Sequence, residues 1–306
     1  MVKMSLLSRE AAKEKGLKSG QLDATLLCSR KANAPNNIAL QRLVDAEDGF
    51  KMSDSKITYC DRKRAFYLMM AITQPRQEVI ADESKVLGVD LGIAVPATIA
   101  TNFDGYYREF IGSAQEIRDF ERQVEDRRRR LSRSRKWAGS GNTGRGYRKR
   151  TEAVNKIGDK IARFKDTKNH QWSKRIVDEA IRLGCGVIQL EDLTGISNNG
   201  EQCLKRWTYY DLQEKITYKA NSLGLKVVKV KPAYTSARCN KCGNIHKSDN
   251  KEEWRPTQDK FKCLRCGHED NADVNAARNI AIPHIDEIIK ADLDKRVDNV
   301  EQIELL

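Results

Sequence analysis

The sequence lacks the long apolar segments that membrane-spanning and secreted proteins need. It has no apolar run of about 18 residues and no apolar N-terminal region typical of a signal peptide. It also lacks internal repeats. Charge is abundant instead, because charged residues make up 32% of the 306 residues and the formal net charge is +13. These features predict a soluble, cytoplasmic protein without membrane contact, whose partner is a polyanion, with nucleic acid as the first candidate.

The cysteines lack the regular spacing of a disulfide framework. Four of the eight are scattered, and the other four form two CxxC pairs with twenty residues between the pairs. The paired residues are Cys239, Cys242, Cys263 and Cys266. This usage fits a reducing compartment and a metal. Four thiolates can surround Zn²⁺ in a tetrahedron and leave no open position, so the pattern predicts a structural and not a catalytic zinc site.

Small residues and histidines accompany the two pairs. Gly243 and Gly267 each follow a second cysteine, where the turn favours a residue that tolerates positive φ. His246 and His268 lie nearby. Because four thiolates already complete the zinc shell, we expect both histidines to be exposed loop residues and not ligands.

The apolar pattern predicts the fold class. Expected strands lie at residues 86–92, 95–101, 186–190 and 225–230, after a β-hairpin at 56–74. Expected helices lie at 114–137, 149–183, 209–223 and 284–306, and a glycine-rich loop at 138–146 separates the first two. Strands followed by strands that alternate with helices indicate an α/β sheet with an antiparallel edge, as in the ribonuclease H-like architecture. The first 50 residues show no sustained periodicity.

Three acids stand at positions that favour chemistry. Asp90 interrupts an apolar strand, where an unpaired acid would be costly. Glu191 closes a later strand, where α/β folds place their sites. Asp273 begins a helix with Asn275 and Arg278 on its polar side, and it could instead be only a helix cap. Together the three acids can converge at one edge of the sheet and bind two Mg²⁺ ions for phosphodiester hydrolysis.

Basic residues are concentrated in two parts of the chain. Residues 118–150 contain thirteen Lys or Arg against four acids, including the run Arg127, Arg128, Arg129 and Arg130. A solvated helix face is one interpretation of this stretch, and phosphate contact, which the net charge favours, is the other. Four further residues flank the paired cysteines and are candidates for steering single-stranded DNA toward Asp273. They are Arg238, Lys241, Lys262 and Arg265.

Four segments carry a resemblance to a known group of nucleases. They are GVDLGIAVPA (88–97), VIQLEDLTGI (187–196), PAYTSARCNKCG (232–243) and CLRCGHEDNADVNAARNI (263–280). These segments resemble the RuvC-I, RuvC-II, zinc-ribbon and RuvC-III segments of transposon TnpB nucleases and of miniature type V CRISPR effectors. The dimer-forming V-F subtype is the most similar. The resemblance runs from about Ile57 to the acidic C-terminal stretch.

The resemblance implies a function and a set of partners. It implies an RNA-guided endonuclease of a prokaryotic cytoplasm that hydrolyses DNA with Mg²⁺, using guide RNA, target DNA and a protein partner or a second copy. Asp90, Glu191 and Asp273 would be its RuvC triad, with Asp90 bridging the two metals. The implied domains are a partial wedge-like β module at 1–80, the RuvC domain at 81–231 with a basic helical hairpin at 114–183, the target-binding zinc ribbon at 232–270, and the last RuvC segment with a C-terminal helix at 271–306.

One departure from the family leaves other functions open. The effectors resemble this chain only from midway through their wedge domain, and their recognition lobe has no counterpart here. We therefore expect either a shortened nuclease subunit that works with a longer partner or one that handles RNA differently. A non-cleaving accessory subunit is the second hypothesis, although three acids that repel phosphate argue against it. A structure-specific nuclease that needs no RNA is the third.

Overall fold

The computed structural model describes the chain except for residues 1, 6, 29, 47–48, 62–63, 74–78, 136–151, 153–156, 193–208 and 305–306. The glycine-rich loop expected at 138–146 lies outside these described residues. The chain divides into two units, Met1–Arg76 and Gln77–Leu306. Within the described part, no helix combines the length and the apolar character needed to cross a bilayer.

The first unit contains short antiparallel strand pairs and two helices. Its paired strands are β1 (Val2–Ser5) with β2 (Gln21–Ala24), β3 (Lys51–Met52) with β6 (Ile72–Thr73), and β4 (Lys56–Cys60) with β5 (Ala65–Met69). Its helices are α1 (Arg9–Glu14) and α2 (Pro35–Val44). The β4–β5 pair confirms the predicted hairpin. The side chain of Ser8 caps α1, and α2 begins with a proline, which needs no N–H partner there.

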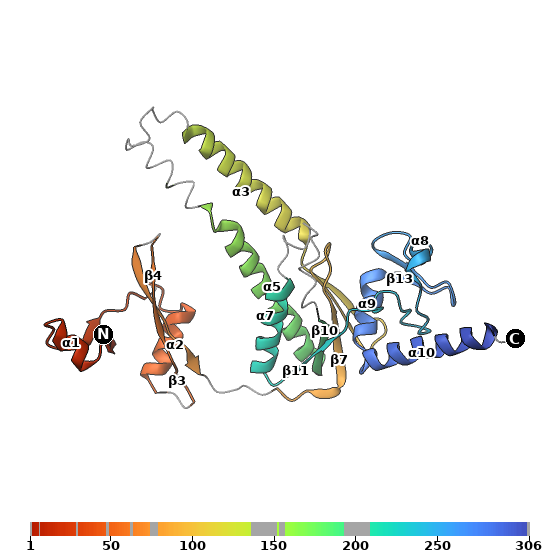
Figure 1. Cartoon of the computed structure of the whole chain (residues 1–306), viewed down its shortest axis with the longest axis horizontal. Coiled ribbons are helices and arrows are strands. Elements are labelled where there is room, and N and C mark those ends of the chain that lie inside the picture. Colours follow the sequence, from red (N-terminus) through yellow and green to blue (C-terminus); the bar gives the residue numbers. More distant parts are fainter. Residues whose placement is uncertain are drawn as a thin grey trace. The chain divides into compact units, whose positions relative to one another are not determined.

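A five-stranded sheet forms the centre of the second unit (Figure 1). Its strands are β7 (Asp82–Asp90), β8 (Ala97–Thr101), β9 (Arg108–Ile111), β10 (Cys185–Glu191) and β11 (Lys226–Val230), in the order β11-β10-β7-β8-β9. β7, β8 and β9 are antiparallel neighbours, whereas β10 runs parallel to both β7 and β11. The predicted α/β sheet with an antiparallel edge is confirmed.

Long helices cover one face of this sheet. α5 (Lys160–Arg182) and α7 (Tyr209–Ser222) bury apolar side chains against it, among them Ile176 and Leu212, which are fully buried. α3 (Ala114–Arg135) lies beside α5 (Figure 1). Phe120 stacks on Phe164 with ring centroids 3.8 Å apart, and the Nζ of Lys165 lies 2.7 Å from a carboxylate oxygen of Glu121. Lys168, four residues after Phe164, also forms an ion pair with Glu116, four residues before Phe120, so the two helices run antiparallel, as in the predicted helical hairpin.

The remaining elements follow β11. A short segment contains α8 (Lys251–Trp254), β12 (Lys260–Lys262) and β13 (Glu269–Asn271), with β12 and β13 antiparallel. α9 (Ala272–Ile280) and α10 (Ile285–Glu304) then complete the chain. The segment 232–271, called the ribbon below, thus lies between the last strand of the sheet and α9.

Gly88 allows α9 to lie directly on β7. A Cβ atom at this position would come within 2.2 Å of the carbonyl oxygen of Ala277 and within 2.5 Å of the backbone nitrogen of Ala281. Leu87 and Val89 point to the opposite face, because side chains alternate along a strand, and they join the core beneath α5 and α7. α9 therefore covers the second face of the sheet at a distance that only glycine permits.

We expect Gly88→Ala to destabilise the second unit by about 1 to 3 kcal/mol or more, because a methyl group there overlaps backbone that cannot move as a side chain would. Urea denaturation followed by circular dichroism measures the change. Gly105→Ala is the matched control, since no atom lies within 4 Å of a Cβ at Gly105. Equal stability of the two variants would contradict the close approach of α9.

Candidate active site

Asp90 and Glu191 lie side by side at the carboxyl ends of neighbouring strands. β7 and β10 are parallel, and Val89 is the partner of Leu190 in their register, so the next residues of the two strands are Asp90 and Glu191. Strands in such a pair are about 4.8 Å apart. Both side chains are buried, and both point to the face that α9 covers, because Asp90 is two residues beyond Gly88.

Asp273 reaches the same place from α9. From Ala277 back to Asp273 the helix advances about 6 Å, and from Gly88 to Asp90 the strand advances about 6.6 Å, so the two acids lie level with each other. A Cβ atom at Gly92, just after β7, would lie 3.8 Å from Oδ2 of Asp273. The sequence left open that Asp273 is only a helix cap. Asn271 is the cap, since its side chain accepts hydrogen bonds from the N–H groups of Asp273 and Val274.

Glu191 and Asp273 both repel the carboxylate of Asp90 electrostatically. Burial raises the pKa of Asp90 well above its ordinary value, and the charges of Glu191 and Asp273 raise it further, while Arg255 opposes the shift. Burial also raises the pKa of Glu191, against a hydrogen bond from Thr235, and raises that of Asp273, against the charge of Arg255. A bound cation would offset this repulsion, and an all-oxygen donor set suits Mg²⁺.

The spacing of the acids differs from that of a single tight metal cage. Among the described residues, the four paired cysteines are the group whose potential ligand atoms all lie within 4.8 Å of one another. The oxygens of Asp90, Glu191 and Asp273 are therefore spread more widely than this. Wider spacing is compatible with two cations, which in two-metal sites lie about 3.5 to 4 Å apart.

Three residues that the sequence did not single out support the acids. The buried Thr235 donates its hydroxyl hydrogen bond to Oε1 of Glu191, and the side chain of Gln213 donates to the carbonyl oxygen of the same glutamate. The guanidinium of Arg255 lies 3.8 Å from Oδ1 of Asp273. These are tertiary contacts without a characteristic spacing, so no pattern in the sequence indicates them.

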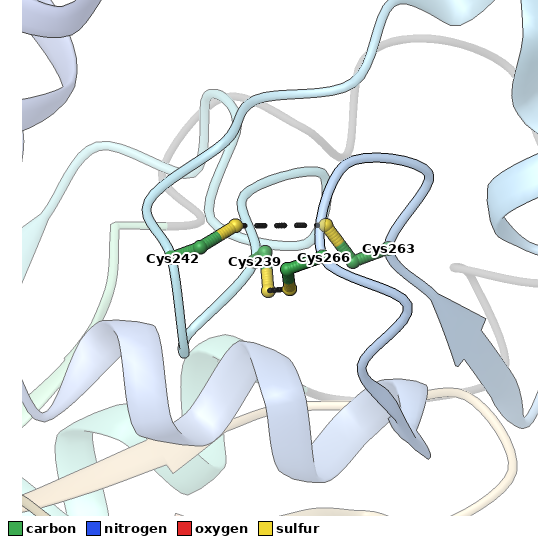
Figure 2. Close-up of side chains that lie close together, drawn as sticks. All are labelled: Cys239, Cys242, Cys263 and Cys266. Carbon is green, nitrogen blue, oxygen red and sulfur yellow. Dashed lines mark hydrogen bonds between the residues drawn. The ribbon is translucent and has the colours of Figure 1, made fainter.

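The four paired cysteines come together in the ribbon (Figure 2). The Sγ atoms of Cys239 and Cys266 are 3.8 Å apart, and those of Cys242 and Cys263 are 3.6 Å apart. These distances are far too long for disulfides. They match the sulfur separation of about 3.8 Å that a tetrahedral zinc site with Zn–S bonds of about 2.3 Å requires. The residues therefore fit the predicted Zn²⁺.

The two cysteine turns have the same backbone geometry. Gly243 has φ of 72° and Gly267 has φ of 67°, and each N–H donates to the carbonyl oxygen of the first cysteine of its pair over 2.9 Å. The expected need for positive φ at both glycines is confirmed. Burial raises the pKa of Cys239 to about 12. This buried thiol therefore ionises readily only when a cation is present.

Two asparagines of α9 attach the ribbon to the helix that lies on the five-stranded sheet. Asn275 accepts a hydrogen bond of 3.0 Å from the N–H of Asn240 and donates one of 2.8 Å to the carbonyl oxygen of Arg238. Asn279 donates to the carbonyl oxygens of Thr235 and Arg238, at 2.9 and 2.6 Å. Asn275, expected on the polar side of the helix, is in fact fully buried. The helix that carries Asp273 thus also holds the first cysteine turn.

The structure places the predicted basic residues in different environments. Arg127, Arg128, Arg129 and Arg130 are all exposed on α3, and Lys241, Lys262 and Arg265 are exposed on the ribbon. Arg238 differs, because its side chain is buried, donates to Oδ1 of Asn279 over 3.0 Å and lies 3.6 Å from a carboxylate oxygen of Asp292. Its surroundings suit a structural role better than a phosphate contact.

One histidine also departs from the expectation. His246 is buried and not exposed, and its ring lies 5.6 Å from that of Trp254 and 5.7 Å from that of Phe261. The reason is that the ribbon has a small core of its own, which also includes Cys239 and Cys263. The expectation of an exposed loop residue was therefore wrong for His246.

Comparison with known sequences identifies relatives. A family model described as "Cas12f1-like, TNB domain" matches residues 209–280. The chain is 43% identical to the CRISPR-associated endodeoxyribonuclease Cas12f1 of Sulfoacidibacillus thermotolerans, over 94% of this chain and 64% of that protein. It is 29% identical to the putative RNA-guided DNA endonuclease InsQ of Escherichia coli K12, over 64% of this chain and 48% of that protein. The chain thus spans less than two thirds of these relatives, and the similarity begins well before Ile57.

Solved structures agree with the sequence comparison. The chain matches a cryo-EM structure of a CRISPR-Cas12f ternary complex with a TM-score of 0.55 and 26% identity, over 82% of this chain and 49% of that chain. It matches a cryo-EM structure of a Cas12f1–sgRNA–target DNA complex with a TM-score of 0.52 and 25% identity, over 75% of this chain and 56% of that chain. The mixed α/β fold and the resemblance to miniature type V effectors are confirmed.

Removal of the metal should unfold the cysteine turns of the ribbon and leave the sheet intact, because Cys239 and Cys263 belong to a hydrophobic cluster separate from that of the sheet. We expect hydrogen exchange of residues 232–271 to accelerate after chelation, with little change in β7 and β10. Cys242→Ser should lose the bound zinc measured by mass spectrometry of the native protein, whereas the exposed Cys28→Ser should keep it. Zinc retention by Cys242→Ser would contradict the assigned ligand set.

Asp90→Asn should stabilise the protein when divalent cations are absent. The pKa of Asp90 is raised in the folded state, so the ionised form destabilises the fold progressively as the pH rises above about 4, the ordinary value. We expect a gain of at least about 1 kcal/mol at pH 7 that shrinks toward pH 4, measured by urea denaturation. Glu83→Gln, at an exposed acid of the same strand, should show no such gain. A destabilised Asp90→Asn variant would contradict the repulsion.

Proposed function

We propose that this chain, which is similar to a Cas12f1 endodeoxyribonuclease over 94% of its length, is an RNA-guided DNA endonuclease, or the nuclease subunit of one. The observation that carries the proposal is the convergence of Asp90, Glu191 and Asp273 from two strands and a helix. Burial raises the pKa of all three acids, and the charges of Glu191 and Asp273 raise that of Asp90 further, so the ionised cluster destabilises the fold and has a purpose if it binds cations. The relatives are named as endonucleases, and this supplies the reaction class.

The sheet order supports a RuvC-type, ribonuclease H-like nuclease domain. Three antiparallel strands followed by two parallel strands that alternate with helices form its centre. In our assignment this domain occupies residues 81–231 and 271–306, the target-binding zinc ribbon occupies 232–270, and a partial wedge-like module occupies 1–80. The family-model match to residues 209–280 supports the ribbon assignment.

The acids would hold two Mg²⁺ ions, which when bound activate a water molecule and stabilise the leaving oxygen of the phosphodiester. Asp90, whose pKa is raised by the charges of both Glu191 and Asp273, would hold the ions together with these two acids. Thr235 and Gln213 fix the orientation of Glu191 through hydrogen bonds. Arg255, beside Asp273, is in a position to pair with a phosphate oxygen.

The other proposed partners follow from charge and from the relatives. Guide RNA and target DNA are polyanions, and the exposed arginines 127–130 of α3 together with Lys241 and Arg265 of the ribbon offer phosphate contacts. In this proposal Zn²⁺ is structural and stabilises the ribbon that delivers the strand. A second protein subunit completes the assembly, and the prokaryotic cytoplasm is its location.

Cleavage of DNA tests the proposal. The chain is incubated with its guide RNA, any copurifying partner and Mg²⁺ on single- and double-stranded DNA, and the products are separated by gel electrophoresis. We expect Asp90→Ala to reduce the rate at least about 100-fold, because the charge stabilisation by the metals amounts to several kcal/mol. Glu83→Gln should cleave at the rate of the unaltered chain.

Three outcomes of this assay separate the hypotheses. Equal cleavage by Asp90→Ala and the unaltered chain would refute the site. Binding of DNA without any metal-dependent cleavage would support a non-cleaving accessory subunit. Cleavage that needs no RNA would support a structure-specific nuclease.

A further inference from the structure

A pocket of about 770 Å³ opens in the ribbon next to the candidate active site. Its walls include the chain at Tyr234, the segment from Lys247 to Arg255, and Leu293 of α10. This volume is in the range of sites that hold small organic groups. The pocket is distinct from the cysteine cluster, which none of its lining residues belongs to.

Two of the pocket's boundaries are shared with the acids. Arg255 lines the pocket, and its guanidinium lies 3.8 Å from Asp273. Tyr234 lines it from the other side, and the next residue, Thr235, donates a hydrogen bond to Glu191. Consecutive Cα atoms are about 3.8 Å apart, so the pocket wall at Tyr234 continues directly into the residue that contacts Glu191.

Tyr234 is held in an unfavourable backbone conformation. Its φ of 67° lies in the left-handed region, which is rare for a bulky side chain. Its carbonyl oxygen accepts hydrogen bonds from the N–H groups of Ala237 and Arg238, so the turn itself is needed. Glycine or asparagine would hold this turn at lower cost. The residue is 45% exposed and belongs to none of the hydrophobic clusters of the described residues, so neither the turn nor the core explains a tyrosine here.

The charges around the pocket favour an anionic occupant. Lys247, Lys251 and Arg255 line it, against the single acid Asp249. Both lysines are exposed, and neither forms an ion pair with a side chain in the part of the chain that the structure describes. Trp254 supplies an apolar floor, since its ring is buried and its N–H donates to the carbonyl oxygen of Lys247 over 2.9 Å.

We propose that this pocket binds the base of one unpaired nucleotide of the DNA strand, with the ring of Tyr234 stacked on the base and the basic side chains at its phosphate. A base that is paired and stacked in a duplex cannot enter such a pocket, so the occupant is single-stranded. Tyr234 is then a positioning residue that places the neighbouring phosphodiester at Asp90, Glu191 and Asp273. The inference rests on the proposed nuclease function and adds a base-binding subsite in the ribbon.

Binding of a strand with and without bases tests the pocket. The full-length Asp90→Asn chain is titrated, at fixed salt, into a fluorescein-labelled single-stranded thymidylate oligomer and into an abasic oligomer of equal length and charge. Fluorescence anisotropy gives the ratio of the two Kd values. We expect the chain with Tyr234 to bind the thymidylate oligomer about tenfold or more tightly than the abasic oligomer, because one base–aromatic stack contributes this order of affinity.

Variants of Tyr234 assign the preference to the ring. Tyr234→Ala and Tyr234→Asn should each reduce the ratio about fivefold or more, and Asn tolerates the left-handed backbone, so the loss cannot be ascribed to unfolding. Tyr234→Phe should keep the ratio. Tyr106→Ala, at a tyrosine that is 95% exposed, is the matched control and should keep it too. An unchanged ratio in both Tyr234→Ala and Tyr234→Asn would overturn the proposal.

A cleavage assay with Asp90 intact separates this inference from the proposed function. Metal-dependent cleavage, together with an unchanged ratio of the two Kd values in the Tyr234 variants, would refute the base-binding pocket but not the proposed nuclease function. A Kd ratio that depends on Tyr234, in a chain that does not cleave DNA, would support the base-binding pocket and refute the proposed nuclease function.

Discussion

The contact between Gly88 and the backbone of α9 is the constraint on which the candidate site depends. Helix and strand approach each other so closely that a Cβ atom at Gly88 would lie only 2.2 Å from the carbonyl oxygen of Ala277. This contact fixes the height of Asp273 relative to Asp90. The same helix then presents Asn275 and Asn279 to the ribbon. One short helix thus positions the acids and the cysteine cluster relative to the sheet.

Burial and charge oppose each other in this region. Burial disfavours the ionised forms of Asp90 and of Cys239, so a bound cation stabilises each of these two groups. The cysteine cluster and the three acids differ in how much room they leave for a ligand. The cysteine sulfurs lie close enough to enclose one ion completely, whereas the acids are spread more widely and leave room for substrate. One region therefore combines a closed structural site with an open site suited to chemistry.

Residue types and spacing predicted much of this arrangement. Acids at the ends of apolar strands predicted Asp90 and Glu191 as site residues, and the two CxxC pairs predicted the cysteine cluster. Both patterns can be recognised within a short stretch of sequence. The environments of Arg238 and His246 could not be foreseen, since proximity to a cysteine in sequence says nothing about which side of a turn faces the ribbon's own core. Thr235, Gln213 and Arg255 act on the acids across the fold, and only the tertiary structure shows them. The cap at Asn271 likewise needed the hydrogen-bond geometry of α9.

The hydrogen bonds from Asn275 and Asn279 have a thermodynamic consequence. The nine-residue helix α9 carries Asp273 at its beginning and the attachment of the first cysteine turn along its length. Occupancy of the carboxylates and occupancy of the thiolates therefore act on one shared element, which makes the two equilibria reciprocal. By whatever factor zinc tightens the affinity of the acids for their cations, those cations tighten the affinity of the ribbon for zinc by the same factor.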